Sequence, residues 1–128
     1  MSAITGLRTV SIPVEDQNAA LAFYTNTLGF ALRRDSTTPN GGRWIELEPG
    51  GGDVLVTLEP ATSGIVRGAI GIRFRADDAE AVHAQLSAAG VQVDDILAWP
   101  GVPPMFSFRD PDGNVFSITE DPPQHGQG

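Results

Sequence analysis

Apolar and polar residues alternate along several short runs of the chain, and this period of two predicts β-strands. The first such run extends from Leu7 to Val14. Asp16 then predicts the cap of a helix over roughly Gln17 to Thr27, and Gly29 predicts its end. Three more strands, separated by Gly- and Pro-rich turns, are predicted at Phe30 to Asp35, Arg43 to Glu48 and Val54 to Glu59.

The same order of elements returns in the second half of the chain. A strand is predicted from Ala69 to Arg75, followed by an amphipathic helix from Asp78 to Ala89 that Gly90 ends. The last three predicted strands are Gln92 to Ile96, Met105 to Arg109 and Val115 to Thr119. The interval from Asp16 to Gly29 is 13 positions, as is the interval from Asp77 to Gly90.

The repetition predicts two β-α-β-β-β modules, at about residues 5–60 and 69–120, within one domain covering residues 1–128. The residues from about 121 to 128 have little to bury and are expected to be a disordered tail. A length of 128 residues with 41% hydrophobic content suits a single core.

Composition and charge narrow the classes of function. No run approaches the roughly 18 apolar residues of a membrane helix, and the first residues lack the features of a secretory signal, so a cytoplasmic protein is expected. The absence of cysteine excludes disulfides and thiolate chemistry, and the absence of lysine excludes a Schiff base on lysine. A net charge of −8 argues against nucleic acid and favours a cationic ligand, although acidity also serves solubility alone.

The last two predicted strands are joined by the turn Asp110-Pro111-Asp112-Gly113-Asn114. Together with Phe23-Tyr24 and Leu28-Gly29-Phe30, this turn resembles signature segments of the vicinal oxygen chelate superfamily, which holds glyoxalase, bleomycin-resistance proteins and extradiol dioxygenases. The likeness covers roughly residues 5 to 120. It implies an α+β fold in which each module curls its sheet into a half-barrel, with helices on the convex face, a ligand on the concave face, and two chains paired in a homodimer.

Metal-dependent members of that superfamily, as the resemblance implies, carry His, Gln or Glu on the first and last strands of each module. Alignment of the two helix starts places Thr9 and Gly71 at two of these positions and Ser117 at a third. Hydroxyl groups and a glycine make a poor ligand set for a divalent metal. The fourth position falls near Ile45 or Glu46 and near Val56 or Thr57. The expectation is therefore a protein without metal or other cofactor, closer to a binding protein than to an enzyme.

The two histidines do not change that expectation. His83 falls on the second predicted helix and His125 in the tail, so both are expected away from the concave face. We expect His83 to have a surface or partly buried structural role.

Strand alternation predicts which side chains face the ligand. The candidate ligand-binding residues are Thr9, Ser11, Trp44, Glu46, Arg73, Trp99, Met105 and Ser117. Tryptophans suit a flat, partly aromatic ligand, because an indole offers both a stacking face and a hydrogen-bond donor. Trp99 is expected on a proline-rich loop at the rim. In the alternative reading both tryptophans only fill space, and Glu46 and Arg73 form a structural ion pair.

Three functions are compatible with these residues. The first is metal-free sequestration of a small, aromatic natural product or drug, which gives resistance without altering the molecule. The second is a glyoxalase-like lyase or isomerase that acts on a small metabolite, with Glu46 as its base. The third is a domain that stabilises or regulates another protein. The first is the prediction, with a small molecule and a second copy of the chain as partners, and with neither nucleic acid nor membrane.

Overall fold

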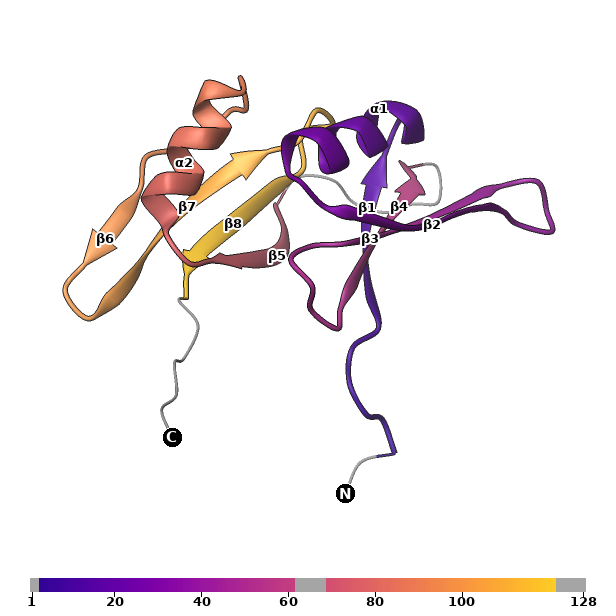
Figure 1. Cartoon of the computed structure of the whole chain (residues 1–128), viewed down its shortest axis with the longest axis horizontal. Coiled ribbons are helices and arrows are strands. Elements are labelled where there is room, and N and C mark those ends of the chain that lie inside the picture. Colours follow the sequence, from indigo (N-terminus) through magenta and orange to yellow (C-terminus); the bar gives the residue numbers. More distant parts are fainter. Residues whose placement is uncertain (1–2, 62–68, 122–128) are drawn as a thin grey trace. The chain divides into compact units, whose positions relative to one another are not determined.

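A computed structural model describes residues 3–61 and 69–121 of the chain, the side chains of residues 69 and 70 excepted. The chain divides into two compact units, Met1–Val66 and Arg67–Gly128, and each contains one four-stranded sheet with a helix on one face (Figure 1). The predicted α+β class with two β-α-β-β-β modules is confirmed. The single-domain organisation stays a prediction, and residues 122–128 of the expected tail lie outside the described residues.

The first unit follows the predicted order of elements. Its sheet has the strand order β1-β4-β3-β2, with β1 parallel to β4 and the other neighbours antiparallel. The elements are β1 (Thr9–Val14), α1 (Gln17–Ala22), the π-helix η1 (Phe23–Thr27), β2 (Ala31–Thr37), β3 (Arg43–Glu48) and β4 (Leu55–Pro60).

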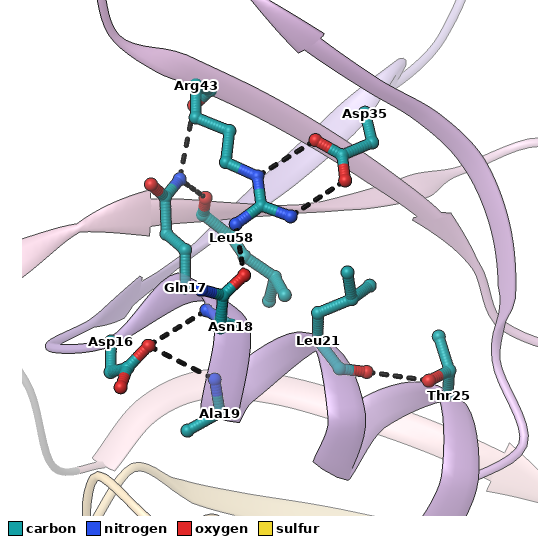
Figure 2. Close-up of polar contacts among 9 residues, drawn as sticks. All are labelled: Asp16, Gln17, Asn18, Ala19, Leu21, Thr25, Asp35, Arg43 and Leu58. Atoms are coloured by element: carbon teal, nitrogen blue, oxygen red, sulfur yellow. Dashed lines mark hydrogen bonds and ion pairs between the residues drawn. The ribbon is translucent and has the colours of Figure 1, made fainter.

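Polar contacts tie the first turn of α1 to the sheet (Figure 2). The Gln17 side-chain amide donates to the backbone carbonyls of Arg43 and Leu58, at 3.1 and 2.9 Å. The Arg43 guanidinium donates to both carboxylate oxygens of Asp35, at 2.9 and 2.7 Å, and also to the side-chain oxygen of Asn18. These bonds hold the first turn of α1 against β3 and β4.

The first helix departs from the prediction of one continuous α-helix. The α-helical part ends at Ala22, and the chain continues to Thr27 as a π-helix, in which the Leu28 amide donates to the Phe23 carbonyl five residues back at 3.1 Å. The Thr25 hydroxyl donates to the backbone carbonyl of Leu21 at 2.7 Å. Such bonding to the carbonyl four residues back bends a helix, and we attribute the wider turn to it.

The two helical segments differ in length, although the interval counted from the sequence was 13 positions for both. The cap of the first helix, Asp16, accepts hydrogen bonds from two backbone amides and lies 13 positions before Gly29. The cap of the second helix is Asp78 rather than Asp77, and it lies 12 positions before Gly90. The helical segment of the first module, from its cap to the glycine that follows, therefore has one residue more, and the π-helix accommodates it.

The second unit repeats the topology, with the strand order β5-β8-β7-β6 and a parallel β5·β8 pair. Among the described residues, no helix is long and apolar enough to cross a membrane. The elements are β5 (Ala69–Ala76), α2 (Ala79–Ala88), β6 (Leu97–Trp99), β7 (Val102–Arg109) and β8 (Val115–Glu120).

The strand predicted at Gln92 to Ile96 is wrong. This segment makes only an isolated bridge between Val93 and Phe108, and the edge strand β6 begins at Leu97. Trp99 consequently ends a strand instead of lying on a loop. Of the three prolines of the predicted loop, Pro103 and Pro104 lie within β7. They precede Met105, where pairing with β8 begins, so their missing N–H groups break no ladder with β8.

The core of each unit lies between its sheet and its helix. In the first unit Ile12, Ile45, Leu47, Val56 and Leu58 are fully buried, with Ala20 and Tyr24 of the helix. In the second unit Phe108 and Phe116 are buried with ring centroids 5.4 Å apart, and Phe74 lies within 5.5 Å of Phe116. The ring of His83 packs edge-on against Phe106, with centroids 5.0 Å apart, and its Nε2 lies 2.9 Å from the Asp94 carbonyl oxygen. These contacts agree with the structural role expected for His83.

Candidate functional site

The face of the first sheet opposite α1 carries a group of polar side chains, which we call the polar face: Ser11, Trp44, Glu46, Thr57 and Glu59. Register brings them together, because Thr57 on β4 is paired with Ser11 on β1 and with Glu46 on β3. The buried Ile45 and Leu47 alternate with Trp44 and Glu46, as side chains on a strand must. The polar face is therefore the back of a packed sheet.

Glu46 is the most enclosed carboxylate of the polar face, with 4% of its surface exposed. The indole Nε1 of Trp44 donates to its Oε2 at 2.9 Å, and Arg8 Nη1 lies 3.0 Å from the same oxygen. The hydrogen bond from Trp44, and after it that from Arg8, lower the pKa of Glu46 below its ordinary value. A base works best with a pKa near the working pH, so these contacts make Glu46 a weak general base.

Glu46→Gln is expected to lower the thermal midpoint at neutral pH and to make stability less sensitive to acid. The pKa of Glu46 is lowered from 4.5 in the folded protein, so the ionised group contributes stability above that value. The contribution is lost as the pH falls through the lower, folded-state pKa. Circular-dichroism melts from neutral pH to about pH 3 measure the difference between the two proteins. A difference that stays constant over this range would contradict the assignment.

Glu59 shares its Oε2 between two hydroxyl groups. The Ser11 hydroxyl donates to it in a short hydrogen bond, and the Thr57 hydroxyl lies 3.3 Å from it. The two hydroxyl oxygens of Ser11 and Thr57 are 3.0 Å apart. Glu59 and Thr57 were not among the predicted ligand-binding residues, although alternation along β4 with the β1 register would have placed both beside Ser11.

The second unit contains a cavity of about 320 Å³ on its own sheet, which we call the second-unit cavity. Two predicted residues, Met105 and Ser117, line it. The rest of the lining is Asp94, Asp95, Leu97, Phe106 and Ser107. The contribution of residues 94 to 97 was missed because the sequence predicted a regular strand there, with side chains fixed by alternation.

Corresponding strands in the two sheets carry different chemistry. Ser117 is paired with Arg73 and Ser107 in the way that Thr57 is paired with Ser11 and Glu46. Two residues after Ser117 and Thr57, Thr119 on β8 corresponds to Glu59 on β4; two residues before Ser107 and Glu46, Met105 on β7 corresponds to Trp44 on β3. The first sheet thus presents carboxylates where the second presents hydroxyls, and an indole where the second presents a thioether.

The remaining predicted residues lie as follows. Thr9 is half-buried at the start of β1, and Arg73 is exposed on β5. Trp99, at the end of β6, has 54% of its surface exposed. Glu46 and Arg73 belong to different units, so the ion pair considered between them stays a prediction. The observed ion-pair partner of Glu46, Arg8, was not anticipated.

The donor groups do not fit a divalent metal. Gly71 has a φ of +78° at a register shift in β5 and offers no side-chain donor, while Thr9 and Ser117 offer only hydroxyls. Within residues 3–61 and 69–121, no three His, Cys, Asp or Glu side chains gather as a metal site would require. We therefore derive no chemistry through a metal.

Comparison with known proteins agrees with this fold. The family model of the Glyoxalase/Bleomycin resistance protein/Dioxygenase superfamily matches residues 6–118, and the chain belongs to that superfamily. The resemblance drawn from the sequence is thereby confirmed.

Two solved structures and one further relative illustrate the similarity. TnmS3, an antibiotic binding protein from Streptomyces sp. CB03234, is 35% identical with a TM-score of 0.84, over 93% of this chain and 98% of its own. A superfamily member from Sphaerobacter thermophilus DSM 20745 is 30% identical with a TM-score of 0.85, over 92% and 98%. The uncharacterized protein YetH of Bacillus subtilis (strain 168) is 27% identical over 122 residues, 91% of this chain and 99% of its own. Antibiotic binding thus occurs among the relatives.

Proposed function

We propose that this protein binds a small, flat, partly aromatic natural product or drug without a metal, and protects by sequestering it. The observation that carries the proposal is the second-unit cavity, because its volume of about 320 Å³ lies within the range of small-molecule sites. Leu97 and Met105 supply apolar surface, and the Ser107 and Ser117 hydroxyls supply hydrogen-bonding groups. The relationship to TnmS3 supports an antibiotic as the ligand class.

A homodimer is part of the proposal, as the superfamily resemblance implies. Leu97, Trp99 and Val102 are large apolar side chains with 49, 54 and 39% of their surfaces exposed, and all three lie on the β6–β7 hairpin. Burial of such surface favours association. A second copy of the chain and the ligand are the two partners that this hairpin would meet.

One experiment tests capture, turnover and assembly together. The purified protein is titrated with aromatic polyketide, aminocoumarin and quinolone antibiotics while tryptophan fluorescence is followed, and complexes are then examined by native mass spectrometry. We expect quenching by at least one compound, an assembly mass of twice 13.5 kDa, and a ligand released with unchanged mass. A ligand at 100 times its Kd should stabilise the fold by about 2.7 kcal/mol in thermal unfolding.

Three outcomes of this experiment would contradict parts of the proposal. A released compound of altered mass, formed in proportion to time and protein concentration, would favour the glyoxalase-like lyase or isomerase instead. Absence of quenching and of stabilisation across all three classes would count against an aromatic ligand. A mass of 13.5 kDa at micromolar concentration would contradict the homodimer.

A further inference from the structure

Among the described residues of the first unit, the polar-face carboxylate of Glu59 has no cationic partner, whereas its neighbours do. The ion pairs on β2 and β3 are Asp35 with Arg43, Glu46 with Arg8, and Glu48 with Arg33. Glu59, on β4, forms no ion pair with any residue in the described part of the first unit; its partners there are the Ser11 and Thr57 hydroxyls. It is an anion stabilised by neutral donors, and therefore open to a cation.

Glu59 is nevertheless held in a defined position. Ser11 and Thr57 both donate to Oε2, and the side chain of Thr57 is fully buried and cannot move aside. The other oxygen, Oε1, accepts no hydrogen bond from the residues described in this unit. An ionised carboxylate has about four acceptor sites, so Glu59 keeps the capacity to accept from an incoming group.

An aromatic ring lies on the same face. Glu46 on β3 is paired with Thr57 on β4, and the two strands are antiparallel. Trp44 lies two residues before Glu46, and Glu59 lies two residues after Thr57, so both lie on the same side of this pair. Antiparallel strands keep such residues near one another. Because the indole N–H already donates to Glu46, the ring offers its π face, to which a cation is attracted.

We propose that Glu59, positioned by Ser11 and Thr57 near Trp44, selects ligands that carry an ammonium or comparable cationic group. The inference rests on the proposed small-molecule binding and adds a chemical class for ligands that reach the polar face of the first unit; the second-unit cavity belongs to the other unit. The net charge of −8 attracts such ligands to the protein from a distance. The corresponding position in the second module is the neutral Thr119, so the selectivity belongs to the first unit.

Two probes of matched shape test the inference: 2-(aminomethyl)naphthalene, a cation at neutral pH, and 2-(hydroxymethyl)naphthalene, which is neutral. Their dissociation constants are measured by tryptophan quenching at low salt. The native protein is expected to prefer the cation by about tenfold, as a charge-assisted hydrogen bond allows. Glu59→Gln keeps an acceptor for both hydroxyls and should abolish the preference without changing the affinity for the neutral probe. Asp53→Asn, on an exposed turn, makes the same change in net charge and should keep the preference.

Each result decides between the alternatives. If both probes bind, a cation preference that survives in Glu59→Gln would overturn the assignment of Glu59. A native protein without the preference would overturn it as well. Either result leaves small-molecule binding intact. Loss of the preference in Asp53→Asn as well would show that it follows net charge, and would also overturn it. Failure of both probes to bind the native protein would overturn the inference, and the antibiotic titrations test the proposed function separately. Thermal unfolding of each variant shows whether it is folded.

Discussion

Ser117→Phe is expected to abolish ligand binding while the protein stays folded. Ser117 is half-buried on β8 and lines the second-unit cavity, so a phenyl ring at this position enters space that the ligand would use. A cavity of about 320 Å³ has room for the ring, which limits the cost to the fold. We expect affinity to fall by about 100-fold or more, roughly 2.7 kcal/mol. Fluorescence titration with the best ligand from the antibiotic panel measures it.

The matched control introduces the same ring elsewhere in the same unit. Ser87 is exposed on α2, which packs on the opposite face of the sheet, so Ser87→Phe should leave affinity unchanged. Equal binding by Ser117→Phe and native protein, with thermal midpoints alike, would exclude the cavity as the ligand site.

Phe108→Ala is expected to cause the largest loss of stability in the second unit. Phe108 is 1% exposed on β7, and its ring lies 5.4 Å from Phe116 and 6.4 Å from Phe74. Removing a buried phenyl ring forfeits its burial and leaves a cavity, which typically costs about 3–5 kcal/mol. Urea unfolding followed by circular dichroism measures the free energy of unfolding.

An exposed apolar residue provides the comparison. Leu7 is 72% exposed, so Leu7→Ala should change the free energy of unfolding by less than about 0.5 kcal/mol. A loss below about 1 kcal/mol in Phe108→Ala would mean that its neighbours collapse into the vacated space.

The fold was predictable because its signals are local. Alternation marked β1, β3 and β8 to within two residues, since one face of each strand is buried and the other carries polar groups. Asp16 and Asp78 cap their helices through side-chain bonds to nearby amides, a property of the residue and its immediate neighbours. Features of this kind need no knowledge of tertiary contacts.

The candidate site was less predictable because its contacts join distant segments. The cavity-lining segment from Asp94 to Leu97 has no regular period, since Val93 alone bridges to Phe108 and β6 is only three residues long. The partner of Glu46 is Arg8, 38 positions earlier and outside any strand. Glu59 lies beside Ser11 because β4 pairs with β1, and the sequence of β4 alone does not reveal this pairing.

The additional residue in the first helix affects any comparison of the two halves of this chain. A gap must be opened between Phe23 and Thr27, where the helix widens, before positions further along can be matched. Without that gap, each residue of β3 is matched to a residue of β7 whose side chain points the opposite way, because strands alternate at each step. In such an alignment Glu46 would be compared with the core residue Phe108 instead of Ser107. The difference in charge between the two sheets would then be missed.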